Sequence, residues 1–399
     1  MADNNNNKIL NVPPLRFPEF TDEWEKQKLS DFVERVTRKN KNNESKLPLT
    51  ISAQYGLVDQ ITFFNKVIAS NDISGYYLLK KGEFAYNKSY SGDYTWGAVK
   101  RLDRYEQGAL STLYICFSPL ECVISDYLVH YFETKKWHRE VSEIAVEGAR
   151  NHGLLNIGVA DYFNTKHFLP SKKEQKKIAA FLNLIEKRIA LQTKIIEKYK
   201  SLIKVIRDVL LVDNCSRPIP LSEILIEFTE KTTKNNQYEV LSSTVSGIYS
   251  QKEIFNKEVA SPNNIGYKIL HYDDVVLSPQ NLWMGNINYN DKYKIGIVSP
   301  SYKTYRIAED YDKKFIAAIL KTHRALYNYM LVSEQGASVV RRNLNIEAFE
   351  QLIFKIPNYE KQQKIGSILR NLEYKLSRLE RLKNCYLRQK QFFLQQMFI

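Results

Sequence analysis

The feature that most constrains this chain is an apolar stripe with a 3.5-residue period between residues 171 and 211. No Pro or Gly occurs in this range, and Ser171 stands three residues before Glu174, as in a capping box. A sustained 3.5-residue period is typical of a coiled-coil helix. We therefore predict one long helix that begins with this box. Only Gln192 interrupts the stripe, which consists of Ile178, Leu182, Ile185, Ile189, Ile196, Tyr199, Ile203, Ile206 and Leu210.

A second stripe of the same kind occupies residues 357–399. Lys383 and Lys390 stand at stripe positions and weaken its later half. Two such helices could each be buried in a separate core, but their length and strict period favour packing on each other. The apolar positions are Ile365, Leu369, Leu372, Leu376, Leu379, Tyr386, Phe393 and Met397.

The two halves of the chain form a tandem repeat. With an offset of 187 residues, Pro170, Gln175 and Ile178 fall on Pro357, Gln362 and Ile365. Shorter matches run upstream in the same order: residues 29–31 with 221–223, 82–86 with 273–277, Ser111 and Tyr114 with Ser299 and Tyr302, and Asn156-Ile157 with Asn345-Ile346.

The repeat predicts alternating globular parts and helices. Short β-like runs (114–117, 275–277 and 294–298) mix with helical stretches at 126–136 and 313–330, so we predict an α+β fold. The expected domains are 1–170 and 212–356, followed by spacer helices 171–211 and 357–399. Because the interiors differ while the frame repeats, we expect one scaffold with two specificities.

The positive charge is concentrated on the two predicted helices. The chain of 399 residues has 58 Lys and Arg against 44 Asp and Glu, a net charge of +14. Residues 171–211 contribute +7 and residues 357–399 contribute +6, whereas the globular parts are close to neutral. We expect the helices to face an acidic partner surface or DNA phosphates, with Lys194, Lys198 and Arg207 as candidates.

The sequence contains no recognisable catalytic constellation. It has no P-loop, no GxGxxG and no Asn/Asp-Pro-Pro-aromatic methyltransferase motif. Its four cysteines lack CxxC spacing, and His130 and His138 have no third ligand in view, so we predict neither a metal nor a cofactor. Glu133-Thr134-Lys135 resembles the end of a nuclease motif by chance. The absence of a signal core or a membrane-spanning stretch predicts a cytoplasmic protein with no membrane partner.

The chain resembles the specificity subunit of type I restriction–modification systems. The resemblance rests on the tandem layout, on the Pro-x-x-x-x-Gln-x-Lys-Ile helix starts at Pro170 and Pro357, and on the opening Pro14-Leu15-Arg16-Phe17-Pro18-Glu19-Phe20 with Asp22-Glu23-Trp24-Glu25. It implies two target-recognition domains that each read half of a bipartite double-stranded DNA site, with two antiparallel coiled-coil helices as spacer and pseudo-two-fold symmetry. It also implies two methyltransferase subunits that methylate adenine and two ATP-driven restriction subunits.

Candidate DNA-reading residues lie in loops at matching positions of the two halves. Arg, Lys, Gln and Asn side chains can read guanine or adenine in the major groove. The first-half candidates are Lys88, Tyr90, Arg150, Asn151 and His152, and the second-half candidates are Gln280, Asn281, Arg341, Arg342 and Asn343. Lys100, Arg101 and Arg104 are candidates for phosphate contacts.

Two other interpretations stay open at this point. The chain could be a coiled-coil scaffold with two protein-binding domains, or the target-recognition part of a fused nuclease–methyltransferase. The missing catalytic motifs disfavour the fused enzyme. Sequence-selective retention of DNA in the presence of a methyltransferase partner would distinguish a specificity subunit from a scaffold.

Overall fold

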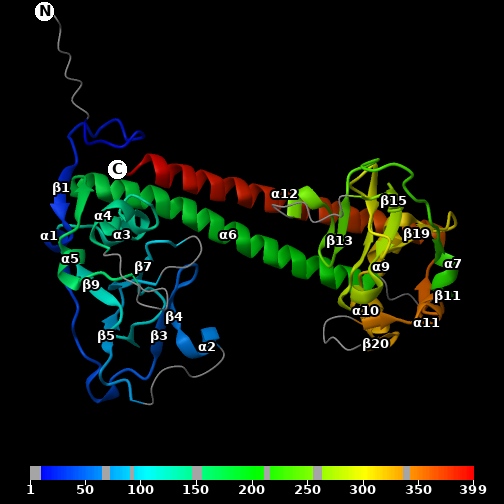
Figure 1. Ribbon diagram of the computed structural model, residues 1–399, viewed down its shortest axis with the longest axis horizontal. Helices are drawn as coiled ribbons and strands as arrows, with labels where there is room; N and C mark the ends of the chain where they lie inside the picture. The colour runs from blue at the N-terminus through cyan, green and yellow to red at the C-terminus, as the bar shows by residue number, and fades with distance from the viewer. Residues whose placement is uncertain are drawn as a thin grey trace, which may run out of the picture. The chain divides into compact units, whose positions relative to one another are not determined.

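The computed structural model describes residues 10–64, 72–89, 94–145, 155–210, 216–254, 263–335 and 342–399 (Figure 1). The chain divides into two compact units. Unit 1 consists of residues 1–193 and 382–399, and unit 2 consists of residues 194–381. Each unit mixes helices and strands, which confirms the predicted α+β class. Within the described residues, no helix is both long enough and apolar enough to cross a membrane.

Unit 1 is built around two four-stranded sheets. The first has the order β2-β9-β6-β7 and is antiparallel throughout: Val33–Arg35, Ile115–Pro119, Phe84–Asn87 and Ala98–Arg101. The second has the order β4-β3-β8-β5: Gly56–Asp59, Pro48–Ser52, Gln107–Leu110 and Tyr77–Lys80. Strands β1 (Glu25–Lys28) and β10 (Lys166–Leu169) pair separately. The short helices are α1 (Leu29–Phe32), α2 (Gln60–Phe64), α3 (Ser125–Phe132), α4 (His138–Ile144) and α5 (Val159–Phe163), with η1 (Lys41–Asn43).

Unit 2 repeats the first of these four-stranded sheets, whereas its other described strands form two-stranded pairs. Its four-stranded sheet has the order β12-β19-β16-β17: Leu225–Glu227, Lys303–Ile307, Asp274–Leu277 and Ile287–Tyr289. The paired strands are β11 with β22 (Arg217–Pro220, Ile353–Ile356), β13 with β14 (Leu241–Thr244, Gly247–Ser250), β15 with β18 (Lys268–His271, Ile295–Val298) and β20 with β21 (Ser333–Gln335, Arg342–Leu344). The short helices are α7 (Leu221–Ile224), α8 (Gln251–Ile254), α9 (Lys313–Ile319), α10 (His323–Leu331) and α11 (Ile346–Glu350), with η2 (Pro279–Met284).

The glutamine shared by the two long helices makes the same hydrogen bonds in both units. Gln175 donates from Nε2 to the carbonyl oxygen of Pro170 (2.9 Å) and accepts at Oε1 from the amide of Ile124 (2.8 Å). Gln362 bonds to Pro357 (2.9 Å) and to the amide of Asp312 (2.9 Å) in the same way. Both glutamines are buried. The shared motif therefore fixes each long helix to the backbone of its own globular part.

A turn before the central strand is also repeated, despite different residues. Gly82 and Asp273 occupy it with φ values of +89° and +72°. The next residue, Glu83 or Asp274, accepts a 2.7 Å bond from the amide three residues earlier. The positive φ strains Asp273 but not glycine, so the turn geometry, rather than the residue type, is what the halves share.

The match of Asn156-Ile157 with Asn345-Ile346 is displaced by two residues in the structure. Helix α11 begins after Asn345, whose side chain accepts from the amide of Ala348, and α5 begins after Gly158. Gly158, not Asn156, is therefore the counterpart of Asn345. The predicted helical stretch 313–330 is likewise two helices, because the chain turns at Leu320 and the Thr322 side chain caps α10.

The two stripes form long helices, α6 (Lys172–Leu210) and α12 (Tyr359–Gln396), drawn in green and in orange to red in Figure 1. Within the described side chains, every predicted stripe position is buried or half-buried. In unit 1, the Phe181 ring lies edge-on to Phe393 (4.8 Å), and Arg188 lies over Tyr386. In unit 2, Lys200 pairs with Glu380 (2.7 Å), and Arg207 pairs with Glu373 (2.8 Å). The helices run antiparallel within each unit, as the resemblance implies.

The start of α6 differs from the predicted capping box. The Ser171 hydroxyl accepts from the amide of Glu174 (3.4 Å), but the Glu174 carboxylate does not return to the cap. It is buried and receives two 2.7 Å bonds from the guanidinium of Arg16. Phe17 packs edge-on against Phe181 and beneath the ammonium of Lys177. The opening motif therefore binds the N-terminal segment to α6.

Candidate nucleic-acid interface

Two of the predicted DNA-reading segments meet in unit 2. Strand β16 ends at Leu277 and leads into η2, which carries Gln280 (exposed) and Asn281 (half-buried). The β20–β21 hairpin carries Arg342 (half-buried) and Asn343 (exposed) and packs on η2. The Arg342 guanidinium carbon lies 4.4 Å from the ring centre of Trp283 in η2. Arg341 lies outside the described residues.

A half-buried lysine bonds to the end of the η2 loop. Lys321 donates from Nζ to the carbonyl oxygens of Gly285 (2.7 Å), at the end of η2, and Val245 (3.3 Å), at the tip of the β13–β14 hairpin. Burial, and then the positive charge of Arg207, lower the pKa of Lys321 to about 8. One ammonium group therefore connects the two loops.

Side-chain amides fix the base of the same loops. Asn286 and Asn288 are buried and bond to Ser243: the Ser243 hydroxyl donates to Asn286 Oδ1 (2.7 Å) and accepts from Asn288 Nδ2 (2.7 Å). Asn288 also donates to the carbonyl oxygen of Thr244 (2.7 Å). This satisfied polar network holds β13 against β17, so the surface loops rest on a rigid base.

In unit 1, a described residue at the edge of one predicted segment bonds to a described residue that follows the other. Lys88 follows β6 and is half-buried, and its carbonyl oxygen accepts from the amide of Leu155 (2.9 Å). Leu155 resumes the described chain after residues 146–154. Tyr90, Arg150, Asn151 and His152 lie outside the described residues. Lys88 and Leu155 thus bring the flanks of both loops together, at the place where unit 2 brings together η2 and β21.

Two residues near this site were not predicted, and one predicted phosphate contact bonds to other residues of unit 1. Trp283 and Lys321 were not predicted, although a tryptophan three residues after Gln280 was a readable signal. Arg101, a predicted phosphate contact, donates instead to Asp126 Oδ1 (2.7 Å) and to the hydroxyl of Ser125 (2.8 Å). Its guanidinium is therefore engaged inside unit 1.

One group of side chains in the described residues has metal-ligand character. Ligand atoms of His130, Glu133 and Glu186 lie within 4.8 Å of one another. The ammonium of Lys390 lies 2.7 Å from a Glu133 oxygen and 2.6 Å from a Glu186 oxygen, and so it balances the two carboxylates. The arrangement is an ion-pair cluster between α3, α6 and α12, and Glu133 has a structural role in it.

Comparisons with known proteins agree on one family. Residues 223–385 match the family model of the type I restriction modification DNA specificity domain. The type I restriction-modification S subunit from M. genitalium has a similar structure, with a TM-score of 0.56 and 13% identity over 97% of this chain and 99% of that one. A structure from work on complex assembly and conformational transition of the type I R-M system gives 0.55 and 13%, covering 96% and 97%. No curated protein matches the sequence significantly.

The family match and the shared fold confirm the resemblance found in the sequence. Residues 223–385 match the model of the DNA specificity domain of type I restriction–modification systems, and the whole chain is similar in fold to solved S subunits.

Proposed function

We propose that this chain is the DNA specificity subunit of a type I restriction–modification complex and reads a bipartite target, one half-site for each globular part. The observation that carries the proposal is the repeated frame: the four-stranded sheet β2-β9-β6-β7 of unit 1 recurs as β12-β19-β16-β17 in unit 2, and in unit 2 the polar η2 and β21 segments meet. Arg342 and Gln280 offer the planar donor and acceptor groups that read base edges. The proposed recognition domains are residues 1–170 and 212–356, with α6 and α12 as spacer.

In this proposal the chain itself performs no catalysis. Methyltransferase subunits supply adenine methylation, restriction subunits supply ATP-driven cleavage, and two copies of each are expected because the chain offers two repeated units. The basic surplus of the helices supports an acidic partner surface, with Lys194 and Lys198 exposed and Arg207 already paired with Glu373. The proposal places the complex in the cytoplasm, where the DNA is.

The proposal is tested by exchanging one recognition domain. Cells would carry only this chain and its methyltransferase subunit, and the methylated motif would be sequenced. Replacing residues 212–356 with the equivalent segment of another family member should change one half of the motif and leave the other unchanged. A simultaneous change in both halves would contradict modular reading, and a scaffold protein would show no sequence-selective methylation.

Single substitutions test the assigned residues. Arg342→Ala should cost about 1–3 kcal/mol in discrimination at one base pair of the second half-site, because a bidentate contact is lost. Lys355→Ala is the matched control, since Lys355 is an exposed cation of unit 2 on β22, away from the η2 loop. Equal effects of both substitutions would show that only general charge was measured.

A further inference from the structure

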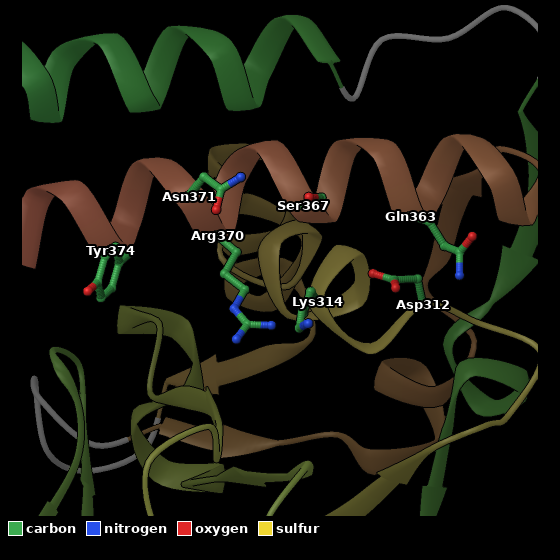
Figure 2. Close-up of a pocket in the computed structure, with 7 residues that line it drawn as sticks. All are labelled: Asp312, Lys314, Gln363, Ser367, Arg370, Asn371 and Tyr374. Atoms are coloured by element: carbon green, nitrogen blue, oxygen red, sulfur yellow. The ribbon is translucent and has the colours of Figure 1, made fainter.

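A hollow beside α12 in unit 2 contains two cations that point into the same space. It has a volume of about 400 Å³ and is lined by Lys314, Gln363, Ser367, Arg370, Asn371 and Tyr374, with Asp312 at one end. Figure 2 shows the Arg370 side chain extending from α12 toward Lys314 at the start of α9. Two adjoining hollows, of about 380 and 220 Å³, also include Lys314 and Arg370.

The helices on either side of this hollow are in close contact. A Cβ atom on Gly366 would lie 2.5 Å from Asp312 Oδ1 and 3.0 Å from the amide nitrogen of Phe315. Only glycine permits this approach, so the positions of Lys314 and Arg370 follow from the packing of α9 on α12. In the part of the chain that the structure describes, neither cation has an ion-pair or hydrogen-bond partner. The same hollow also holds the Asp312 carboxylate, whose Oδ1 accepts from the amide of Phe315 (2.8 Å), so its lining carries two exposed cations and one acid.

The equivalent place in unit 1 is closed by the protein's own carboxylate. The repeated glutamine bonds align Ile124 with Asp312, so Asp126 corresponds to Lys314, and Asn183 corresponds to Arg370. Asp126 accepts from Arg101 (2.7 Å) and from Asn183 Nδ2 (2.8 Å). Phe84 and Val275 are equivalent positions of the repeat. Across the sheet, Phe84 pairs with Arg101 and Val275 pairs with Tyr289, so Tyr289 is the counterpart of Arg101. Tyr289 also lines the adjoining hollows.

We infer that the hollow in unit 2 binds a carboxylate side chain of the methyltransferase subunit, in the place that Asp126 occupies in unit 1. The choice of partner rests on the proposed function. A single carboxylate fits this lining better than a DNA backbone, because a run of phosphates would extend over Asp273 and Glu309 along the adjoining hollow, whereas one carboxylate meets only Lys314 and Arg370. Tyr272, Tyr359 and Tyr374 are about half exposed around it, and tyrosine and arginine are enriched at protein interfaces.

This inference implies that the two units do not bind their partners alike. Unit 1 satisfies its charges internally and offers no vacant anion position there, whereas unit 2 needs a partner's acid to balance Lys314 and Arg370. The first methyltransferase subunit to assemble should therefore prefer unit 2.

The test transfers the closed network of unit 1 into unit 2. A triple variant, Lys314→Asp, Arg370→Asn and Tyr289→Arg, supplies the carboxylate and both of its partners from the chain itself. Binding of the full-length variant to the purified methyltransferase subunit would be measured by calorimetry in the absence of DNA. We expect the dissociation constant to rise about tenfold, with a smaller rise at high salt.

A second variant keeps the test independent of how the triple variant folds. Lys314→Gln with Arg370→Gln removes both charges, and Lys355→Gln with Arg324→Gln removes two exposed charges elsewhere in unit 2 as the control. Unchanged affinity of both hollow variants, with the melting temperature retained, would overturn the inference. Weaker DNA binding by an otherwise normally assembled complex would overturn it in favour of phosphate. If the unmodified chain bound no methyltransferase subunit, the proposed function would fail as well.

Discussion

The two units carry charges of opposite sign at equivalent positions beside their long helices. Glu133 and Lys321 are equivalent, since Glu133 follows α3 and Lys321 follows α9. The next residue in each case is a threonine whose hydroxyl donates to the carbonyl oxygen three residues earlier, that of Tyr131 (2.7 Å) or Ile319 (2.9 Å). In unit 1, Glu133 and Glu186 share the ammonium of Lys390. In unit 2, Lys321 lies near Arg207, which pairs with Glu373.

This difference distinguishes the interactions that both units share from those that vary between them. The threonine and glutamine bonds go from side chains to backbone and are the same in both units, so they define the frame. The charged positions differ because each unit needs only local neutrality around its long helices. Two halves of one chain therefore satisfy the same geometry with different electrostatics.

The comparison can be measured because the tryptophans are unevenly divided. Of the four in the chain, Trp24, Trp96 and Trp137 lie in unit 1, and Trp283 is in unit 2. In a Trp283→Phe background, denaturant unfolding followed by fluorescence reports unit 1. Hydrogen exchange of β16 and β19 amides reports unit 2 in the unmodified chain.

The largest effect is expected from Lys390→Met. The substitution leaves Glu133 and Glu186 partly buried without a counter-charge and should destabilise unit 1 by about 3 kcal/mol. Arg207→Met in unit 2 should cost about 1 kcal/mol, because the Glu373 side chain is more than half exposed. Lys383→Met, at another stripe position of α12, is the control. Similar losses in the free energy of unfolding of the two units would contradict the proposed difference in their electrostatics.

Substitution of the shared glutamines should affect both units alike. Gln175→Leu and Gln362→Leu each leave a buried amide and a prolyl carbonyl without partners, a loss of about 2 kcal/mol in the respective unit. Gln363→Leu, on the exposed face beside Gln362, serves as the control. A loss confined to one unit would show that the motif has a structural role in only one repeat.

Acid should destabilise unit 1 selectively through His167. Thr165 donates to the carbonyl oxygen of Tyr162 (2.6 Å), so it accepts from His167 Nε2 (2.8 Å), and Tyr131 donates to Nδ1 (2.8 Å). This arrangement fixes the neutral ring. Burial, and then the charge of Lys26, lower the pKa of His167 to about 3 from an ordinary 6.5.

Because the unfolded chain takes up this proton below pH 6.5 and the folded chain does not, stability present above pH 6.5 is lost as the pH falls toward 3. Between pH 7 and pH 5 the loss should be about 2 kcal/mol in unit 1. Unit 2 has Phe354 at the equivalent strand position. Denaturant curves at the two pH values, with His167→Gln as the comparison, should show a flatter dependence for the variant; an equal slope would rule out His167 as the cause.

The smallest effect concerns Lys321 in alkaline solution. Its pKa of about 8 lies below the ordinary 10.5, so the folded state releases a proton that the unfolded state keeps. Unit 2 should gain about 1 kcal/mol between pH 8 and pH 9 relative to a Lys321→Met variant. Hydrogen exchange in β16, corrected for the intrinsic pH dependence of exchange, measures this gain. A constant difference between the two proteins would mean that the lysine titrates normally.

The sequence allowed the long helices, the repeat and the α+β class to be predicted because each leaves a local or periodic signal. Ile178 and Ile365 belong to stripes whose period is set by helix geometry alone. The interruption of 313–330 at Thr322 was missed, because apolar residues continue through the turn and conceal the cap. The displacement of Asn345 from its expected match was missed because glycine and asparagine both occur at helix N-caps but do not align in sequence.

The candidate site could be predicted only by segment. Gly-bearing and polar loops indicated η2 and β21, but nothing in the linear order showed that Arg342 stacks on Trp283 or that Lys321 reaches Gly285. Those contacts depend on strand pairings between distant residues. Lys390 was misjudged for the same reason: taken alone it weakens a stripe, yet its partners Glu133 and Glu186 lie far away in the chain.

The glutamine bonds have a consequence for how such a chain can change over generations. Gln175 and Gln362 recognise a backbone amide, and the residues that supply it, Ile124 and Asp312, have nothing in common as side chains. Because the glutamine binds only the backbone, the segment that supplies this amide can change its side chains without any change in the long helix. Recombination within either globular part would preserve the hydrogen bonds to the helix. New combinations of half-sites could therefore arise by exchange of whole segments of a globular part, without compensating substitutions in the helices.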